Sequence, residues 1–371
     1  MLITTVFYSA VYFIVVLGIL VFIHEFGHFI LAKKLGVGVL KFSLGFGPKL
    51  FGKKIGETVY QIAVVPLGGF VKLVGENREE EVKEEDQSRS FFFQPIWKRA
   101  LIIFAGPFFN MFLALVFLCF SFLFFGVPQE PLPLPSKIGA LSPGLPAEKA
   151  GLRKGDVIIS IDGTGISTWD NLSSIIRKSE GKEITLQVKR NGEDLEVKVR
   201  PEISKEKTSP GEKVPYVIGI TAPYEEMTFL YKKVSPTEAV SEGVLQTWLW
   251  TKLTIVVVAK IVTGEISSKM IGGPIEVARQ AGKQGKKGLP YLLGLIAILG
   301  VNLGLINLFP IPILDGGHLL FLGIEAILGR PISMKKMEIA QQIGLILLIL
   351  LMFFAFYNDL LRIFSPGGFN F

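Results

Sequence analysis

Four long segments of the chain contain no charged residue, and each is long enough to cross a membrane. They are residues 1–23, 100–126, 288–314 and 339–358. An α-helix rises about 1.5 Å per residue, so about 20 apolar residues cross a hydrocarbon core about 30 Å thick. The pattern predicts an α-helical membrane protein with four transmembrane helices, over about 5–31, 100–126, 289–314 and 339–360.

Residues 56–76, GETVYQIAVVPLGGFVKLVGE, alternate apolar and polar side chains on both sides of a break at 66–69. Alternation with a period of two, interrupted by proline and glycine, is typical of a β-hairpin. We therefore expect a hairpin over about 57–74. The acidic stretch at 76–90 is typical of a solvated loop.

Residues 136–222 alternate short strand-like and helix-like segments. A helix start at 142–151 precedes the apolar strand DVIISID. Further on, two strand-like segments flank Asn191 and Gly192, a favoured two-residue hairpin turn. These features predict a small, soluble α/β domain over 134–222, inserted between the second and third membrane segments.

Residues 243–262 are long enough to cross a membrane, but Lys252 and Lys260 interrupt them and two tryptophans lie near one end. Lysines and tryptophans of this kind are typical of a helix that lies in the membrane interface. We expect a linker over 223–287 that contains an interfacial amphipathic helix at 243–262. The chain then has an N-terminal membrane half at 1–126 and a C-terminal membrane half at 288–371.

The composition agrees with a membrane protein, because 50% of the 371 residues are hydrophobic and the mean hydropathy is +0.49. The net charge of +7 comes from lysines and arginines in loops that flank the apolar segments, without interleaved aromatic residues. This pattern argues against nucleic-acid binding. The single cysteine, Cys119, excludes an internal disulfide and a multi-cysteine metal site.

The distribution of positive charge predicts the orientation of the chain. Twelve lysines and arginines lie between Ala32 and Arg99. Because cytoplasmic loops are rich in these residues, we expect this loop in the cytoplasm, and both termini and residues 127–287 on the other side of the membrane. The first segment lacks the basic start and the cleavage site of a secretory signal, so we expect it to be retained as an anchor.

Two histidines and a glutamate lie at the end of the first apolar segment, in the sequence HEFGH at 24–28. His24 and His28 are four residues apart, so their imidazoles share one face of a helix, and Glu25 projects beside them. A carboxylate at mid-membrane costs roughly 2.5–3.5 kcal/mol, whereas structural zinc contributes on the order of 10 kcal/mol in small peptides. Metal binding therefore offsets the cost of burying these groups.

A catalytic zinc takes three protein ligands and keeps one position open, so one more ligand is needed. Asp315 and His318, in NLFPIPILDGGH, are the candidates. Pro310 and Pro312 break the helix just before them, and irregular backbone at membrane depth is tolerated where it lines a cavity.

Depth decides whether these candidates can meet His24. Counted along their helices, His24 and Asp315 both fall near the cytoplasmic side if residues 243–262 do not cross the membrane. If that segment crossed, Asp315 would lie on the opposite side from His24. The metal site and the interfacial helix are therefore linked predictions.

Two other classes of protein have similar features. A membrane transporter or metal-handling channel could use HEFGH to bind the ion that it moves, because polar residues at mid-membrane mark such pathways. A non-catalytic scaffold could use the soluble domain to recruit peptides. Glu25 favours an enzyme over both, because neither transport nor scaffolding needs a base beside two ligands.

Five segments resemble, in order along the chain, the site-2 protease family in its bacterial RseP-type branch. They are HEFGH, AGPFFN at 105–110, AGLRKGDVIISIDG at 150–163, GGPIEVARQAG at 272–282 and NLFPIPILDGGH at 307–318. The resemblance implies an intramembrane zinc metalloprotease with one PDZ domain, where some relatives carry two in tandem. It also implies that the hairpin re-enters the membrane.

The resemblance further implies one Zn²⁺ per chain, held by His24, His28 and Asp315, with Glu25 as the general base. His318 is then expected beside the ligands rather than as a fourth ligand. The implied substrate-binding residues are Asn302, Asn307, Pro66, Leu67, Gly68, Gly69 and Phe70. From the residues alone, either asparagine could instead bond a neighbouring helix.

The implied substrates are single-span membrane proteins, for example an anti-sigma factor or signal-peptide remnants. Such a helix must unwind before it is cut, and an edge strand offers replacement hydrogen bonds. The PDZ groove is expected to bind a peptide or protein C-terminus. The implied location is the bacterial inner membrane, in contact with lipid, with the active site near the cytoplasmic side.

Overall fold

The computed structural model describes residues 2–76, 83–204, 215–223, 227, 229–268 and 271–364. Two compact units divide the chain. The first, which we call the helical unit, comprises Met1–Val127 and Lys233–Asp359. The second, which we call the inserted unit, comprises Pro128–Lys232 together with Leu360–Phe371.

The helices and strands follow one another along the chain as expected for a membrane protein with one insertion. The first part contains α1 (Leu2–Lys34), β1 (Val39–Ile55), β2 (Thr58–Leu73), a 3₁₀ turn (Glu84–Arg89) and α2 (Ile96–Phe125). The insertion contains β3 (Val127–Pro131), β4 (Ala140–Leu141), α3 (Pro146–Lys149), β5 (Val157–Ile161), β6 (Thr164–Gly165), α4 (Trp169–Lys178), β7 (Ile184–Arg190), β8 (Glu193–Val199), β9 (Glu202–Ile203), β10 (Tyr216–Val217), β11 (Ile220–Thr221) and β12 (Phe229–Lys232). The last part contains α5 (Pro236–Val262), α6 (Pro274–Lys287), α7 (Leu289–Asn307), α8 (Asp315–Leu328) and α9 (Met334–Phe364).

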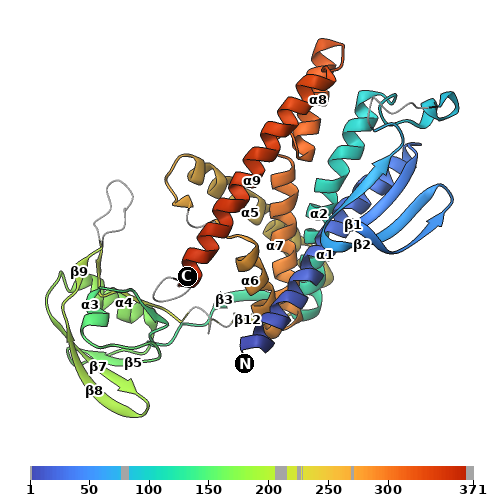
Figure 1. The fold of residues 1–371 in the computed structure, drawn as a ribbon. Coiled ribbons are helices and arrows are strands. Elements are labelled where there is room, and N and C mark those ends of the chain that lie inside the picture. The colour runs from blue at the N-terminus through green and yellow to red at the C-terminus, as the bar shows by residue number, and fades with distance from the viewer. Residues whose placement is uncertain are drawn as a thin grey trace. The chain divides into compact units, whose positions relative to one another are not determined.

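Helix α2 is central to the helical unit and packs against α1, α5, α7 and α8 (Figure 1). Small residues allow this close packing, as is usual between membrane helices. A Cβ atom at Gly27 would lie 2.5 Å from the carbonyl oxygen of Ala105, and one at Gly304 would lie 2.9 Å from that of Pro107. From these contacts and their neighbours, α1 and α7 both run antiparallel to α2.

Among the residues that the structure describes, five helices are long and apolar enough to cross a membrane: α1 from Val6 onward, α2, α5, α7 and α9. Four of them lie where spans were predicted. The fifth, α5, covers the segment expected at the interface, and it begins at a capping box formed by Ser235 and Glu238. By length and composition, the predicted number of four spans is therefore not confirmed.

The third predicted span ends earlier than the sequence suggested. Helix α7 stops at Asn307, residues 308–314 form turns and bends, and α8 begins at Asp315. Pro310 and Pro312 cannot donate backbone hydrogen bonds, which explains the interruption. The prediction that this helix continues to residue 314 was wrong, although the break at the prolines was expected.

Strands β1 and β2 form a sheet that differs from the predicted hairpin. Phe42 of β1 pairs with Tyr60 on one side and with Val71 on the other, so β1 lies between the two halves of β2. Gly45 and Gly47, with φ of 89° and 90°, turn β1 so that its second half also pairs with β2. Among the described residues the halves of β2 do not pair with each other, so the hairpin predicted over 57–74 was wrong in its pairing.

The missing partner explains that error. The sequence pattern did not predict β1. Each half of β2 pairs with this strand and not with the other half of β2. Within the described part of the sheet, residues 69–73 of β2 remain at an edge, with β1 on one side.

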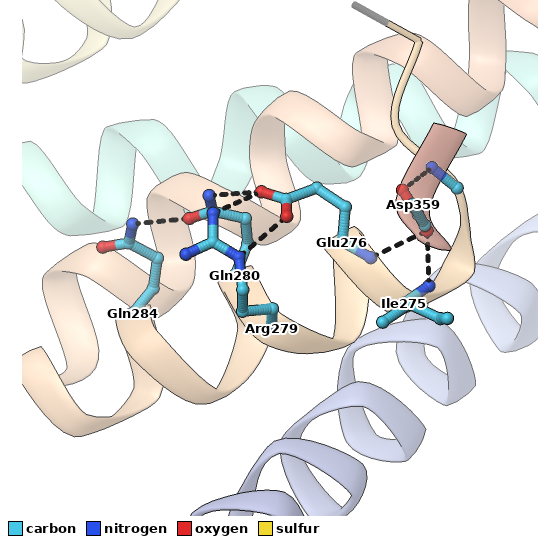
Figure 2. A network of polar contacts seen from close by, with 7 residues as sticks. Ile275, Glu276, Arg279, Gln280, Gln284 and Asp359 are labelled. Carbon is cyan, nitrogen blue, oxygen red and sulfur yellow. Dashed lines mark hydrogen bonds and ion pairs between the residues drawn. The ribbon is translucent and has the colours of Figure 1, made fainter. Parts of the chain in front are cut away.

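Helix α6 begins without a capping side chain of its own, because its N-cap residue is Gly273. The buried carboxylate of Asp359 in α9 accepts hydrogen bonds from the N–H groups of Gly273 (2.9 Å), Ile275 (3.0 Å) and Glu276 (3.1 Å) (Figure 2). A carboxylate at this position satisfies the free N–H groups of the first turn and interacts favourably with the helix dipole. The contact fixes the start of α6 against the end of α9.

Polar side chains continue along α6, where Glu276 accepts hydrogen bonds from Arg279 and Gln280, and Gln280 accepts one from Gln284.

The inserted unit has its own apolar core beneath a four-stranded antiparallel sheet in the order β6-β5-β7-β8. The β7–β8 hairpin turns at Asn191 (φ 52°) and Gly192 (φ 96°), which confirms the predicted turn. Helix α4 begins at Thr168, whose side chain accepts from the N–H of Asn171. Its core is made of buried aliphatic side chains, among them Ile138, Ile158, Ile161, Leu172, Leu186, Val188 and Ile218.

A buried ion pair joins β7 to the turn before β5. The carboxylate of Asp156, which is 1% exposed, accepts hydrogen bonds from Nε and Nη2 of Arg190, each at 2.8 Å, and from the N–H of Arg153 at 2.8 Å. Burial alone would raise the pKa of Asp156. The hydrogen bonds and the positive charge of Arg190 outweigh burial and hold the pKa below its ordinary value.

Replacing Asp156 with asparagine is expected to lower the free energy of unfolding of the inserted unit by about 2 kcal/mol at pH 7, because Arg190 loses its charged partner. The pKa of Asp156 in the folded chain lies below its unfolded value of about 3.9. The difference in unfolding free energy between wild type and variant is therefore fully present above about pH 3.9, and it shrinks as the pH falls through the folded pKa. Hydrogen–deuterium exchange of β7 peptides in the full chain measures the difference. A difference that grows on acidification would contradict the prediction.

Candidate metal centre and active-site cavity

His24 and His28 lie one turn apart on the face of α1 that packs on α2. Their ring centroids are 4.8 Å apart, and their Nε2 atoms are 3.2 Å apart, so both rings point into the same volume. Gly106 of α2 leaves space for them: a Cβ atom there would overlap His28 Nε2 and lie 2.8 Å from His24 Cε1. The imidazoles therefore occupy space that any larger residue at 106 would take.

Asp315 is the first residue of α8, directly after the proline-containing turn. Gly316 and Gly317 follow it, and the turn packs directly on both. A Cβ atom at Gly316 would overlap the carbonyl oxygens of Leu308 and Phe309, and one at Gly317 would overlap that of Ile311. The two glycines are therefore required for the turn that brings Asp315 to the histidines.

The three side chains come together with the spacing of metal ligands. His24 Nε2 lies 3.2 Å from Asp315 Oδ2, and His28 Nε2 lies 3.6 Å from Asp315 Oδ1. With one ligand atom taken from each residue, all of these atoms lie within 4.8 Å of one another. Bonds of 2.0–2.1 Å to a tetrahedral zinc separate its ligand atoms by about 3.3 Å. This donor set of two imidazoles and one carboxylate fits Zn²⁺.

The outer nitrogen of His28 is held by backbone. Its Nδ1 lies 2.8 Å from the carbonyl oxygen of Ile102 in α2. A carbonyl can only accept, so Nδ1 carries a proton, and in the neutral imidazole the lone pair of Nε2 faces Asp315 and His24. The contact therefore selects, for the neutral ring, the tautomer that a metal requires.

The outer nitrogen of His24 is 3.2 Å from Nδ2 of Asn110, and Oδ1 of Asn110 is buried with no hydrogen-bond partner among the described residues. The two ends of an asparagine amide are exchanged by a 180° rotation. With Oδ1 facing His24, the Nδ1–H group donates to it, and the buried oxygen gains its partner. This arrangement again leaves Nε2 of His24 free to bind a metal, so the surroundings of both histidines fit the ion.

The two predicted asparagines have different environments. Nδ2 of Asn307, the last residue of α7, lies 3.5 Å from His24 Nδ1. Oδ1 of Asn302 accepts a hydrogen bond of 2.7 Å from Thr254 of α5. The structure thus brings Asn307 to the histidines and gives Asn302 the neighbouring-helix contact that was the alternative interpretation.

A cavity of about 760 Å³ opens beside the three side chains. Glu25 lines it together with His24, His28 and Asp315, as does His318, whose ring packs edge-on against Phe321 at 6.3 Å. Apolar side chains of α8, α9 and residues 91–92 form much of the remaining wall. The arrangement gives a carboxylate, Glu25, access to the same space as the candidate ligands.

The edge of β2 forms another wall of this cavity. Gly69, Phe70, Val71 and Leu73 line it. A Cβ atom at Gly69 would lie 2.9 Å from Cγ of Glu25, so glycine allows the strand to pass directly beside this residue. Gly68 has a φ of 114°, which few other residues adopt. The side chains of the remaining predicted residues, Pro66 and Leu67, lie outside the described part of the structure.

Sequence reasoning missed an ion pair in the wall of the cavity. Arg99 of α2 and Glu325 of α8 form an ion pair there. A signal for it was available, because Glu325 is a lone carboxylate in the apolar segment HLLFLGIEAIL. Its partner could not be read from the sequence, because Arg99 belongs to a helix far away along the chain.

Comparison with known proteins identifies close relatives over nearly the whole chain. The zinc metalloprotease RasP of Geobacillus kaustophilus is 33% identical over 431 residues, covering 96% of this chain and 98% of that protein. The regulator of sigma-E protease RseP of Escherichia coli is 33% identical over 447 residues (95% and 98%), and the regulator of sigma-W protease RasP of Bacillus subtilis is 33% identical over 433 residues (96% and 99%). These alignments exceed the 371 residues of this chain, so the relatives contain segments without a counterpart here.

One solved structure resembles part of the chain. The PDZ domain of the SdrC-like protein (Lmo2051) from Listeria monocytogenes matches 23% of this chain and 84% of its own length, with 22% identity and a TM-score of 0.20. A score this low does not identify the fold of the inserted unit.

The profile of Peptidase family M50 matches residues 12–351, which is most of the chain. A peptidase profile of this extent leaves the alternative classes, transporter and scaffold, without support. Together with the relatives named as zinc metalloproteases, the match agrees with the donor set around the cavity. The chain belongs to peptidase family M50 and is an intramembrane zinc metalloprotease.

Proposed function

We propose that this protein cuts single-span membrane proteins within the bilayer, with His24, His28 and Asp315 as its zinc ligands and Glu25 as its general base. The observation that carries the proposal is the meeting of three ligand atoms, from helices at opposite ends of the chain, beside one cavity. The orientation of both imidazoles by Ile102 and Asn110 supports the same ligand set.

The side chains divide the work of hydrolysis. When bound, zinc supplies a Lewis acid that polarises the scissile carbonyl and makes a water molecule more acidic. Glu25 takes a proton from the attacking water and passes it to the leaving amide nitrogen, so the net reaction adds one water across the peptide bond. The amide of Asn307, beside His24, is near enough to the ligands to donate a hydrogen bond to the substrate backbone.

A helical substrate cannot be cut while its carbonyl groups are bonded within the helix, so it must become extended. Residues 69–73 of β2 offer an edge along the cavity wall, where an extended chain can form replacement hydrogen bonds. In this proposal β1 and β2 re-enter the membrane. The unpaired backbone groups of the β2 edge must be satisfied by protein there, and the extended substrate supplies the partners. Gly68, Gly69 and Phe70 then contact the substrate, together with the neighbouring Pro66 and Leu67.

The directions of the helices support an orientation with both termini outside the cytoplasm. Because α1 and α7 run antiparallel to α2, the chain between the end of α2 and the start of α7 begins and ends on the same side. If α5 crossed the membrane, a second crossing would be needed before α7, and α6 is too short for it at 14 residues. Helix α5 therefore does not cross in this proposal. Four crossings, by α1, α2, α7 and α9, satisfy this condition, and the Lys- and Arg-rich loop before α2 is then cytoplasmic.

The names of two relatives suggest a class of substrate. They are named "regulator of sigma-E protease" and "regulator of sigma-W protease", so both names connect a protease with a sigma factor. We infer that this protein cuts a membrane-bound regulator of transcription in a bacterial inner membrane. The inserted unit, which we interpret as PDZ-like, would bind a peptide or protein C-terminus.

Replacing Glu25 with glutamine should leave one zinc per chain and lower the cleavage of a single-span substrate by about 100-fold to 10,000-fold, the usual contribution of general acid–base catalysis. Metal analysis of purified protein and mass spectrometry of released peptides measure the two effects. Wild-type cleavage by this variant would refute the assigned base. Zinc-free wild-type protein, carefully prepared and folded, would refute the metal site.

Replacing Gly106 with alanine should weaken zinc binding by about 10-fold to 100-fold, because the new methyl group takes the space of the His28 ring and displaces the ligand. Gly18→Ala on α1 is the matched control, since a Cβ atom there meets nothing within 4 Å. Zinc retained after dialysis against a chelator reports the difference. Equal retention by the two variants would contradict the crowding of the histidines.

A single-span substrate that carries one engineered cysteine beside its cut site and is held against β2 should form a disulfide with a cysteine at position 70, when an added oxidant such as Cu²⁺–phenanthroline removes the two electrons of the two thiols. The experiment uses the Glu25→Gln protein, with Cys119→Ser to remove the natural thiol, and compares Phe70→Cys with Phe51→Cys. Phe51 is exposed and lies in the second half of β1, which pairs with residues 58–63 of β2 and not with residues 69–73. Cross-linking at position 51 but not at position 70 would exclude this edge as the binding site.

A further inference from the structure

Arg99 and Glu325 form a two-point ion pair in the cavity wall. Arg99 donates from Nη2 to Glu325 Oε1 at 2.6 Å and from Nη1 to Oε2 at 3.2 Å. The side chains are only 7% and 14% exposed. Nε of Arg99 also donates to the carbonyl oxygen of Gln94 at 3.0 Å, and its guanidinium lies 5.4 Å from the centre of the Phe92 ring. The guanidinium is therefore held on several sides.

The pair joins the two helices that orient the candidate ligands. Arg99 is one turn before Ile102, whose carbonyl holds the ring of His28. Glu325 belongs to α8, the helix that Asp315 begins. The start of α8 is fixed by the packing of Gly316 and Gly317 on the preceding turn, and the ion pair fixes its other half against α2.

The type of contact matters as much as its position. Two parallel hydrogen bonds between a guanidinium and a carboxylate fix both a distance and an angle. Apolar side chains of similar volume often give a buried site equal or greater stability, because they avoid the loss of hydration. Apolar contacts do not set an angle in this way. A buried ion pair at this place is therefore better explained by orientation than by stability alone.

We propose that Arg99 and Glu325 are positioning residues that set the separation of α2 and α8, and through it the geometry of His28 and Asp315 around the metal. This inference rests on the ligand set proposed above. The two residues act through the ligands and take no part in bond breaking.

The test compares zinc affinity, the visible spectrum of the Co²⁺-loaded protein and the unfolding temperature of the full chain in detergent. Arg99→Lys keeps the charge but loses the two-point contact. The double variant Arg99→Met with Glu325→Leu replaces the pair with apolar side chains. We expect both variants to bind zinc about tenfold more weakly and to show altered Co²⁺ bands, which report the arrangement of the ligands.

Asp156→Asn is the control, because it breaks another two-point ion pair, one that lies within the inserted unit and has a buried carboxylate. It should lower stability and leave zinc affinity and the Co²⁺ bands unchanged. Wild-type zinc affinity and spectrum in either folded Arg99 variant would overturn the inference, even if the other variant did not fold. Failure of the wild-type chain to bind zinc would instead refute the proposed ligand set, so the two failures are distinguishable.

Discussion

The close approach of α1 and α2 is the contact on which the rest of the site depends. At Gly27 and Gly106 the two helices come so near that a single added methyl group would overlap backbone or a histidine ring. This proximity lets α2 hold His28 through a backbone carbonyl and His24 through Asn110. Imidazoles with fixed tautomers aim their Nε2 lone pairs at the space between the candidate ligands, whereas loosely held rings could turn away from it.

Two other polar side chains of the helical unit, those of Asp359 and Asn302, are paired and have a structural role. Asp359 satisfies the N–H groups that start α6, and Asn302 bonds Thr254 between α7 and α5. Each contact joins two elements that are distant along the chain, at a place where an unpaired polar group would cost several kcal/mol. The group around the cavity differs, because His24, His28 and Asp315 turn their ligand atoms toward one another and toward a space that also holds Glu25.

The cavity combines two features that hydrolysis of a membrane helix requires. One wall carries the candidate ligands and Glu25, the proposed base, and the other is the edge of a sheet whose Gly69 passes directly beside Glu25. An extended chain on that edge would lie next to the reacting groups without a further large movement of either wall. The inserted unit has a separate apolar core, so its stability and that of the site can be altered independently.

The sequence alone determined the features that depend on local spacing. The length of the uncharged segments predicted α1, α2 and α9, the four-residue spacing of His24 and His28 predicted a shared helix face, and Asn191–Gly192 predicted the β7–β8 turn. Asp315 could be named as a candidate because a catalytic zinc needs a third protein ligand and this residue directly follows a proline-broken apolar segment. Tertiary structure decided the pairing of β1 with both halves of β2, the partner of Asn302, the contact of Asn110 with His24, and the Arg99–Glu325 pair. These contacts join residues far apart along the chain, where several partners satisfy the same local pattern and only the packing of whole helices and strands selects one.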